Sequence, residues 1–416
     1  MQQAEKVEGG IVLPLSKSLS FMLLAGATVV SSLSMSMFMF IQSWYVVEGL
    51  GLEAALGIVL MCLTGSRMVS MLVGGVLADK SRQTFIMFVS DTSRAVFVLL
   101  LALLFLWLGE VPIWMLAVNA ACFGVLGGLF EPARDSLLPK VVQTDQLTRA
   151  NSVIQGAIQV ALFTGPLLAG VLISLVSYSV LFIVISLLLC VAGIGVLFIK
   201  KMADQPQAEE RPEVPFKHQL KEGCVYMWQS PLLRALFIIT VIVNFFISGP
   251  LMMGLPIFVE GVLNGNSVDF SFVQGGLTFG MIMGSIVIGL INLKRKRGAY
   301  ALYLIALQGV GMLVFSQTQS IIMAIGIIVF IGMINPAVNI PLISMVQAYS
   351  EPQKVGRVMS LIRTGSLGLI PLSYAATSSI LGLGIQIHTI MMWSSFPLML
   401  SATLLFITFP ILRKAD

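Results

Sequence analysis

Long apolar stretches alternate with short polar segments along most of the chain. Twelve stretches hold about 18 or more residues with few charges, enough for a helix to cross the roughly 30 Å hydrocarbon core of a bilayer. Lipid offers the backbone no hydrogen-bond partners, so each stretch is predicted to be an α-helix. The pattern therefore predicts an all-α polytopic membrane protein. The expected spans are residues 19–46, 54–78, 85–108, 112–131, 151–175, 178–199, 235–258, 270–292, 299–316, 320–341, 358–382 and 386–411.

The composition agrees with this pattern. Hydrophobic residues make up 57% of the 416 residues and charged residues only 10%, whereas soluble proteins carry roughly 25% charged residues. Most of the surface is therefore expected to face lipid. The first span is too long, and too far from a small-residue cleavage site, to be expected as a removable signal peptide.

Basic residues are unevenly distributed between the two ends of the predicted spans. Of the 24 Lys and Arg residues, only Arg67, Arg94 and Arg363 fall inside spans, and all the others lie on the side that carries both chain ends. The positive-inside rule predicts that this side is cytoplasmic. Topology thus accounts for the net charge of +5 without a nucleic-acid partner. The opposite loops carry only acidic residues, namely Glu48, Glu53, Glu110, Glu260 and Asp269.

A charged, proline-containing segment divides the chain into two similar parts. One segment, 128–152, aligns with 332–360, so that Gly128 corresponds to Gly332. Both segments follow the fourth span of their part of the chain. Two repeated bundles around a central cavity are typical of secondary transporters. The expected organisation is a cytoplasmic tail (1–18), a six-helix bundle (19–199), a cytoplasmic linker (200–234) and a second six-helix bundle (235–412).

Four motifs carry a resemblance to a known family. They are "GGVLADKSRQ" (74–83), "SDTSRA" (90–95), "EPARDSLLPKVVQTDQLTRANS" (131–152) and "VGRVMSL" (355–361). With these motifs and its twelve spans, the chain resembles the major facilitator superfamily, in particular the bacterial branch of macrolide efflux pumps and the enterobactin exporter. The resemblance implies a monomeric secondary transporter in the bacterial plasma membrane. Its cargo would be an amphipathic small molecule, such as a drug, a macrolide-like compound or a siderophore, exported by alternating access in exchange for protons.

The resemblance also implies a gate on the cytoplasmic side after the second span. There Asp79 would lie against the N-terminal end of the eleventh span (356–359), where unpaired N–H groups and the helix dipole favour an anion. Gly74 and Gly75 would allow close helix approach, and Glu131 would complete an acid–base relay with Lys80 or Arg82. The alternative is a solvated loop whose charges only set the topology. The expected gate residues are Gly75, Asp79, Lys80, Arg82 and Glu131.

Two Gly–Pro pairs interrupt predicted spans. Proline removes a helical hydrogen bond and bends the helix. Gly165 and Pro166, in "ALFTGPLLAG" (161–170), resemble a motif that this superfamily associates with export by antiport. Gly249 and Pro250 interrupt the seventh span in a similar way. Both pairs are candidates for gating kinks, and packing kinks are the alternative.

Charges inside a membrane span are costly, and they commonly have a function. Asp91 and Arg94 are three residues apart on the third span, so they share a helix face and can pair. This pair is either a neutral structural unit, or Asp91 exchanges a proton during transport. Arg67 could reach that pair or the cavity, where it could hold an anionic part of the substrate. Arg363 is the fourth such charge.

The cavity is expected to be apolar with scattered amides. The 24 methionines add a polarizable lining that can adapt to varied ligands. The amide candidates are Asn119, Gln155, Gln159, Asn244, Gln308 and Asn335.

No pattern predicts an enzyme, a cofactor or a metal site. The four cysteines lack metal-ligand spacing, and no phosphate-binding loop suggests ATP-driven transport. Two alternatives to the exporter stay open: a lipid or glycolipid flippase of the same fold, with a positive cavity around Arg67, and a sensor or scaffold that transports nothing.

Overall fold

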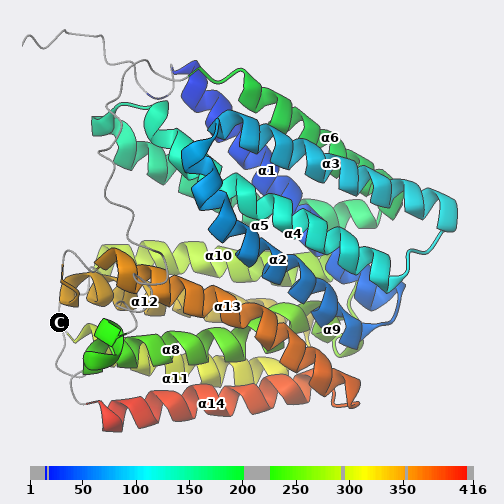
Figure 1. Ribbon diagram of the computed structural model, residues 1–416. Coiled ribbons are helices and arrows are strands. Elements are labelled where there is room, and N and C mark those ends of the chain that lie inside the picture. Colours follow the sequence, from blue (N-terminus) through cyan, green and yellow to red (C-terminus); the bar gives the residue numbers. More distant parts are fainter. Residues whose placement is uncertain (1–14, 16–17, 201–224, 292–295, 352–354, 410–416) are drawn as a thin grey trace, which may run out of the picture.

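The computed structural model describes residues 15, 18–200, 225–291, 296–351 and 355–409, and it is helical throughout these ranges (Figure 1). The first bundle contains α1 (Leu19–Trp44), α2 (Glu53–Lys80), α3 (Gln83–Leu108), α4 (Ile113–Leu137), α5 (Leu147–Ile173) and α6 (Tyr178–Leu197). The second contains α8 (Pro231–Ile247), α9 (Gly254–Gly261), α10 (Ser267–Ile291), α11 (Arg297–Ser316), α12 (Ile321–Tyr349), α13 (Val355–Gly382) and α14 (Ile387–Thr408). Short helices complete the chain: the π-helices η2 (Tyr45–Gly49) and η5 (Ser248–Met253), and the 3₁₀ helices η3 (Leu138–Lys140) and η4 (Thr144–Gln146).

Each of the twelve predicted spans coincides with a helix. The seventh is composite, because α8, η5 and α9 run without a break from Pro231 to Gly261. Within the described ranges, eleven helical segments are long and apolar enough to cross a membrane. The twelfth helix, α13, is 28 residues long but richer in polar side chains, so it falls outside that count.

The two bundles repeat the same packing scheme. In the first bundle α2 packs on α4 and α3 on α6, and in the second α10 packs on α12 and α11 on α14. Gly128 allows the α2–α4 contact, because a Cβ there would lie 2.5 Å from the Arg67 carbonyl oxygen. At the corresponding Gly332, a Cβ would lie 3.1 Å from the Gly280 Cα of α10. The glycines matched by the internal repeat therefore mark the closest helix pair in each bundle.

Several helix ends differ from the predicted ones. α4 and α12 continue to Leu137 and Tyr349, past the predicted ends at 131 and 341. A helix can keep its backbone conformation where it leaves the bilayer, so hydropathy marks the end of the span and not the end of the helix. α8 begins at Pro231, inside the segment predicted as linker. Ser230 caps it by accepting a hydrogen bond from the Leu233 N–H (3.4 Å). The domain limits themselves remain a prediction.

The segment predicted as a polar loop after the second span is mostly helix. α2 continues through Lys80, and only Ser81 and Arg82 separate it from α3. Nothing between the glycines and Ser81 breaks a helix, and Ser81 then adopts an extended conformation that ends it. The motif therefore forms the last two turns of α2 and the tight link to α3.

Candidate functional site

The two bundles touch along two helix pairs, α2 with α13 and α5 with α10. We call the end of the molecule where α6 ends and α8 begins the linker side, and the opposite end the far side. The linker side lies at the left of Figure 1, and on the far side α2 runs beside α9 and α13.

Glycine–serine contacts bring the two bundles together on the far side. A Cβ on Gly57 of α2 would lie 2.7 Å from the Tyr374 carbonyl oxygen of α13, and Ser378 of α13 donates a hydrogen bond to the Ala54 carbonyl of α2. The second helix pair has the same arrangement. Each contact leaves no room for a side chain at the glycine, so the far side is closed.

In that second helix pair, a Cβ on Gly170 of α5 would lie 2.7 Å from the Ser267 carbonyl oxygen of α10. The Ser267 hydroxyl donates to the Gly170 carbonyl at 3.1 Å. Aromatic rings add to this closure: Phe270 of α10 stacks on Phe40 and Trp44 of α1, with ring centroids 4.4 and 5.5 Å apart. The closure therefore combines backbone contact with apolar stacking.

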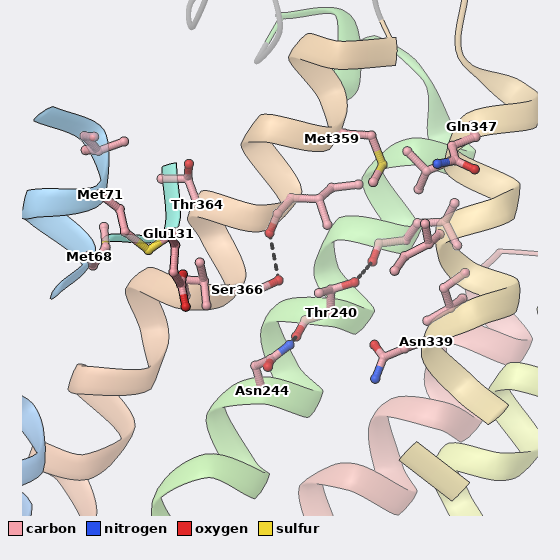
Figure 2. Close-up of a pocket in the computed structure, with 17 residues that line it drawn as sticks. Met68, Met71, Glu131, Thr240, Asn244, Asn339, Gln347, Met359, Thr364 and Ser366 are labelled. Atoms are coloured by element: carbon pink, nitrogen blue, oxygen red, sulfur yellow. Dashed lines mark hydrogen bonds between the residues drawn. The ribbon is translucent and has the colours of Figure 1, made fainter. Parts of the chain in front are cut away.

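A cavity of about 900 Å³ lies between the bundles and extends toward the linker side (Figure 2). Gln347, near the end of α12, and Met359, near the start of α13, place it there, because both helix ends lie on the linker side. The first bundle contributes Met68, Met71, Leu72 and Glu131. The second contributes Leu236, Thr240, Asn244, Asn339, Leu342, Ile343, Val346, Gln347, Met359, Ile362, Thr364, Ser366 and Leu367.

Most of the cavity wall is uncharged. Three methionines and seven branched aliphatic side chains line it, together with six neutral polar side chains. Among the lining residues that the structure describes, Glu131 is the single charged one. The wall suits a ligand with a large apolar body and a few polar groups.

Glu131 forms an ion pair with Arg67 of α2. Each side chain is 30% exposed, so water reaches both partners. Arg67 lies across the close α2–α4 contact from Glu131. The Arg67 guanidinium is in turn paired with the Glu131 carboxylate. The relay expected between Glu131 and Lys80 or Arg82 remains a prediction, and the Lys80 side chain lies outside the described residues.

Asp91 and Arg94 form the expected pair on α3, and it lies in the interior of the first bundle. Their side chains are 0% and 3% exposed. Arg94 Nη2 donates to Asp91 Oδ1 and, at 2.9 Å, to the Ser31 hydroxyl of α1; that hydroxyl donates to Asp91 Oδ1 at 3.0 Å. The guanidinium also lies 5.3 and 5.4 Å from the ring centroids of Phe123 and Phe130. Asp91 Oδ2 and Arg94 Nε have no hydrogen-bond partner among the residues that the structure describes.

A family model for the Major Facilitator Superfamily matches residues 24–373. This chain belongs to that superfamily. It is 24% identical over 305 residues to the uncharacterized MFS-type transporter YvqJ of Bacillus subtilis (strain 168), covering 72% of this chain and 71% of the relative. It is also 24% identical over 301 residues to macrolide efflux protein A of Enterococcus faecalis, covering 70% and 90%.

Solved structures of the superfamily share the fold. The nucleoside transporter NupG superposes with a TM-score of 0.73 at 11% identity, over 94% of this chain and 99% of that one. A bacterial homologue of the human lysosomal transporter Spinster, in an inward-facing and unoccupied conformation, gives 0.71 at 12% identity, over 95% and 99%. The protein is therefore a multi-pass membrane transporter of the major facilitator fold.

The cavity amides expected from the sequence are mostly elsewhere. Only Asn244 lines the cavity. Asn119 donates to the Phe97 carbonyl at 2.7 Å inside the first bundle, and Gln308 is buried inside the second. Asn335 accepts a hydrogen bond from Asn339, which does line the cavity. The remaining two, on α5, are absent from the lining: Gln155 and Gln159.

The two Gly–Pro pairs differ in structure. α5 stays helical through Pro166, and Gly165 packs directly against Ser36 of α1, so this pair serves close packing. Gly249 and Pro250 lie in the π-helix η5, a helix irregularity that is frequent at functional sites. The Gly249 N–H donates to the Ser373 hydroxyl at 2.7 Å. Gating at either pair remains a proposal.

The superfamily gate motif is only partly described. A Cβ on Gly74 would lie 3.0 Å from the Gly128 carbonyl oxygen, whereas one on Gly75 would meet nothing within 4 Å. Among the described residues the close helix approach is made by Gly74, and the role expected of Gly75 remains a prediction. Arg82 is exposed between α2 and α3. Three expected side chains fall outside the described residues: Asp79, Lys80 and Arg363.

Most cavity-lining residues were not predicted, because they are ordinary residues for a membrane helix. Met68 and Met71 are three apart on α2, and Thr240 and Asn244 are four apart on α8. Such spacings place residues on one helix face. They do not reveal that the face points between two bundles.

Proposed function

We propose that this protein is a secondary exporter of amphipathic small molecules that works by alternating access in exchange for protons. The observation that carries the proposal is a central cavity that extends to the linker side, while close helix contacts join the two bundles on the far side. The positive-inside pattern supports a bacterial plasma-membrane location with both termini in the cytoplasm. With that orientation, the cavity opens to the cytoplasm, where an exporter takes up its cargo.

The lining supports an amphipathic cargo, such as a macrolide-like drug or a siderophore. Apolar side chains supply most of the wall, and threonine, serine and amide groups offer hydrogen bonds. Similarity to macrolide efflux protein A adds a candidate substrate class. A flippase would favour a positive cavity around Arg67, but Glu131 neutralises that charge. We therefore keep the exporter as the working function.

Transport in inside-out membrane vesicles tests this proposal. With the vesicle interior acidified, we expect uptake of a radiolabelled macrolide, and a protonophore should reduce it to the level of vesicles without the protein. In these vesicles protons leaving the acidic interior would drive the macrolide into it, so uptake should stop when the proton gradient is lost. Uptake that survives the protonophore would contradict proton exchange. Scrambling of labelled phospholipid without macrolide uptake would favour the flippase.

A further inference from the structure

Glu131 occupies a distinct position in the cavity. Figure 2 shows it on one wall with Met68 and Met71, whereas Asn244 and Asn339 lie on the opposite wall. The other described lining residues carry no charge, so Glu131 is the one charged group that the described wall offers directly to a ligand. Arg67, its partner, is not among the lining residues.

We propose that Glu131 binds a protonated amine of the transported molecule, and that Arg67 holds the carboxylate while the cavity is empty. This inference rests on the proposed transport function and names the substrate class: amphipathic amines. An anionic ligand would meet the Glu131 carboxylate before it reached Arg67. A cationic ligand would meet a carboxylate that faces the cavity.

The exposure of the Arg67–Glu131 pair makes exchange possible. Ion pairs that water reaches contribute little stability, so one cation can replace another at small cost. The Asp91–Arg94 pair differs, because its side chains are 0% and 3% exposed and a ligand has no access to them. Of the three ion pairs in the described ranges, the Arg67–Glu131 pair is the one whose carboxylate lines the cavity.

The rest of the wall fits the body of such an amine. Met68 and Met71 lie on the same wall as Glu131 and offer adaptable apolar contact. Across the cavity, Asn244 donates to the Thr240 carbonyl of its own helix at 2.8 Å. This bond uses one amide N–H, and the rest of the amide can bond to hydroxyl groups of a ligand. A cationic nitrogen at one end and a hydroxylated apolar body at the other match these two walls.

Binding measurements on the purified protein in nanodiscs test the inference. The probes are a macrolide with a protonated dimethylamino group and the same macrolide with that nitrogen demethylated and acetylated. Loss of one charge-assisted contact in Glu131→Gln should weaken binding of the amine about tenfold and leave the neutral probe unchanged. Arg67→Gln should tighten binding of the amine, because the competing cation is gone. A purely structural pair would make both substitutions harmful.

Asp145→Asn is the control, since it also changes an acid to its amide, at an exposed side chain outside the cavity lining. Glu131→Asp keeps the charge and should keep the preference for the amine. If Glu131→Gln does not fold, the tighter amine binding expected for Arg67→Gln and the retained amine preference expected for Glu131→Asp still decide. Equal binding of both probes to wild type would overturn the inference and leave the exporter standing. Failure of wild type to bind either probe would count against the proposed function itself.

Discussion

Asp91→Asn alone should lower the free energy of unfolding by about 3–5 kcal/mol, the cost of breaking a buried ion pair from one side. Arg94 would keep its charge among α1, α3 and α4, where the Ser31 hydroxyl and the new amide oxygen are neutral acceptors that do not balance it. Asp91→Asn combined with Arg94→Gln should recover most of the loss, because the pair is then replaced by two neutral amides. Unfolding in detergent, followed by circular dichroism, measures these differences.

Asp145→Asn is again the control, and its effect should stay within about 0.5 kcal/mol, as for other exposed sites. A double variant no more stable than Asp91→Asn would contradict a neutral structural pair. The same double variant separates the two roles open to Asp91. Macrolide uptake that still depends on the pH gradient would exclude this carboxylate as the proton carrier.

Gly57→Val and Gly170→Val should each move the protein toward a conformation with the far side open. The new side chain would overlap Ser378 in one case and Ser271 in the other. Overpacking costs about 1–3 kcal/mol, which changes an equilibrium about 5- to 150-fold. The steric overlap occurs only in the conformation with the far side closed. The substitution should therefore raise the population of the conformation with the far side open, without unfolding the protein.

Spin labels at positions 52 and 383 report this shift, because Leu52 and Leu383 are exposed and belong to different bundles on the far side. We expect a longer interlabel distance in both valine variants, measured in a cysteine-free background. Gly156→Val is the control on α5, since a Cβ there meets nothing within 4 Å. An unchanged distance distribution in both variants would show that the far-side contacts do not determine the closed state.

Features that depend on local spacing were predictable from the sequence. Membrane spans follow from hydropathy summed over a whole helix, and the Asp91–Arg94 pair follows from residues one turn apart. The repeat between segments around Gly128 and Gly332 predicted two equivalent bundles, and these glycines indeed lie at equivalent helix contacts.

Features that depend on the relation between helices were not predictable. Asn119 and Asn244 are both amides in apolar spans, but one faces a neighbouring helix and the other faces the cavity. The pair between Glu131 and Arg67 was not predicted either, because it depends on the close packing of α2 on α4. Which face of a helix points inward is decided by packing between bundles, and a single sequence does not encode that in its hydropathy.

The aromatic contact between α1 and α10 makes the stability of the closed far side depend on temperature. Phe40, Trp44 and Phe270 are at most 3% exposed while that side is closed. Opening would hydrate these rings, and hydration of apolar surface raises the heat capacity. The balance between the two conformations therefore changes with temperature in a curved manner. Cooling weakens the hydrophobic stabilisation of the closed far side, and moderate warming strengthens it.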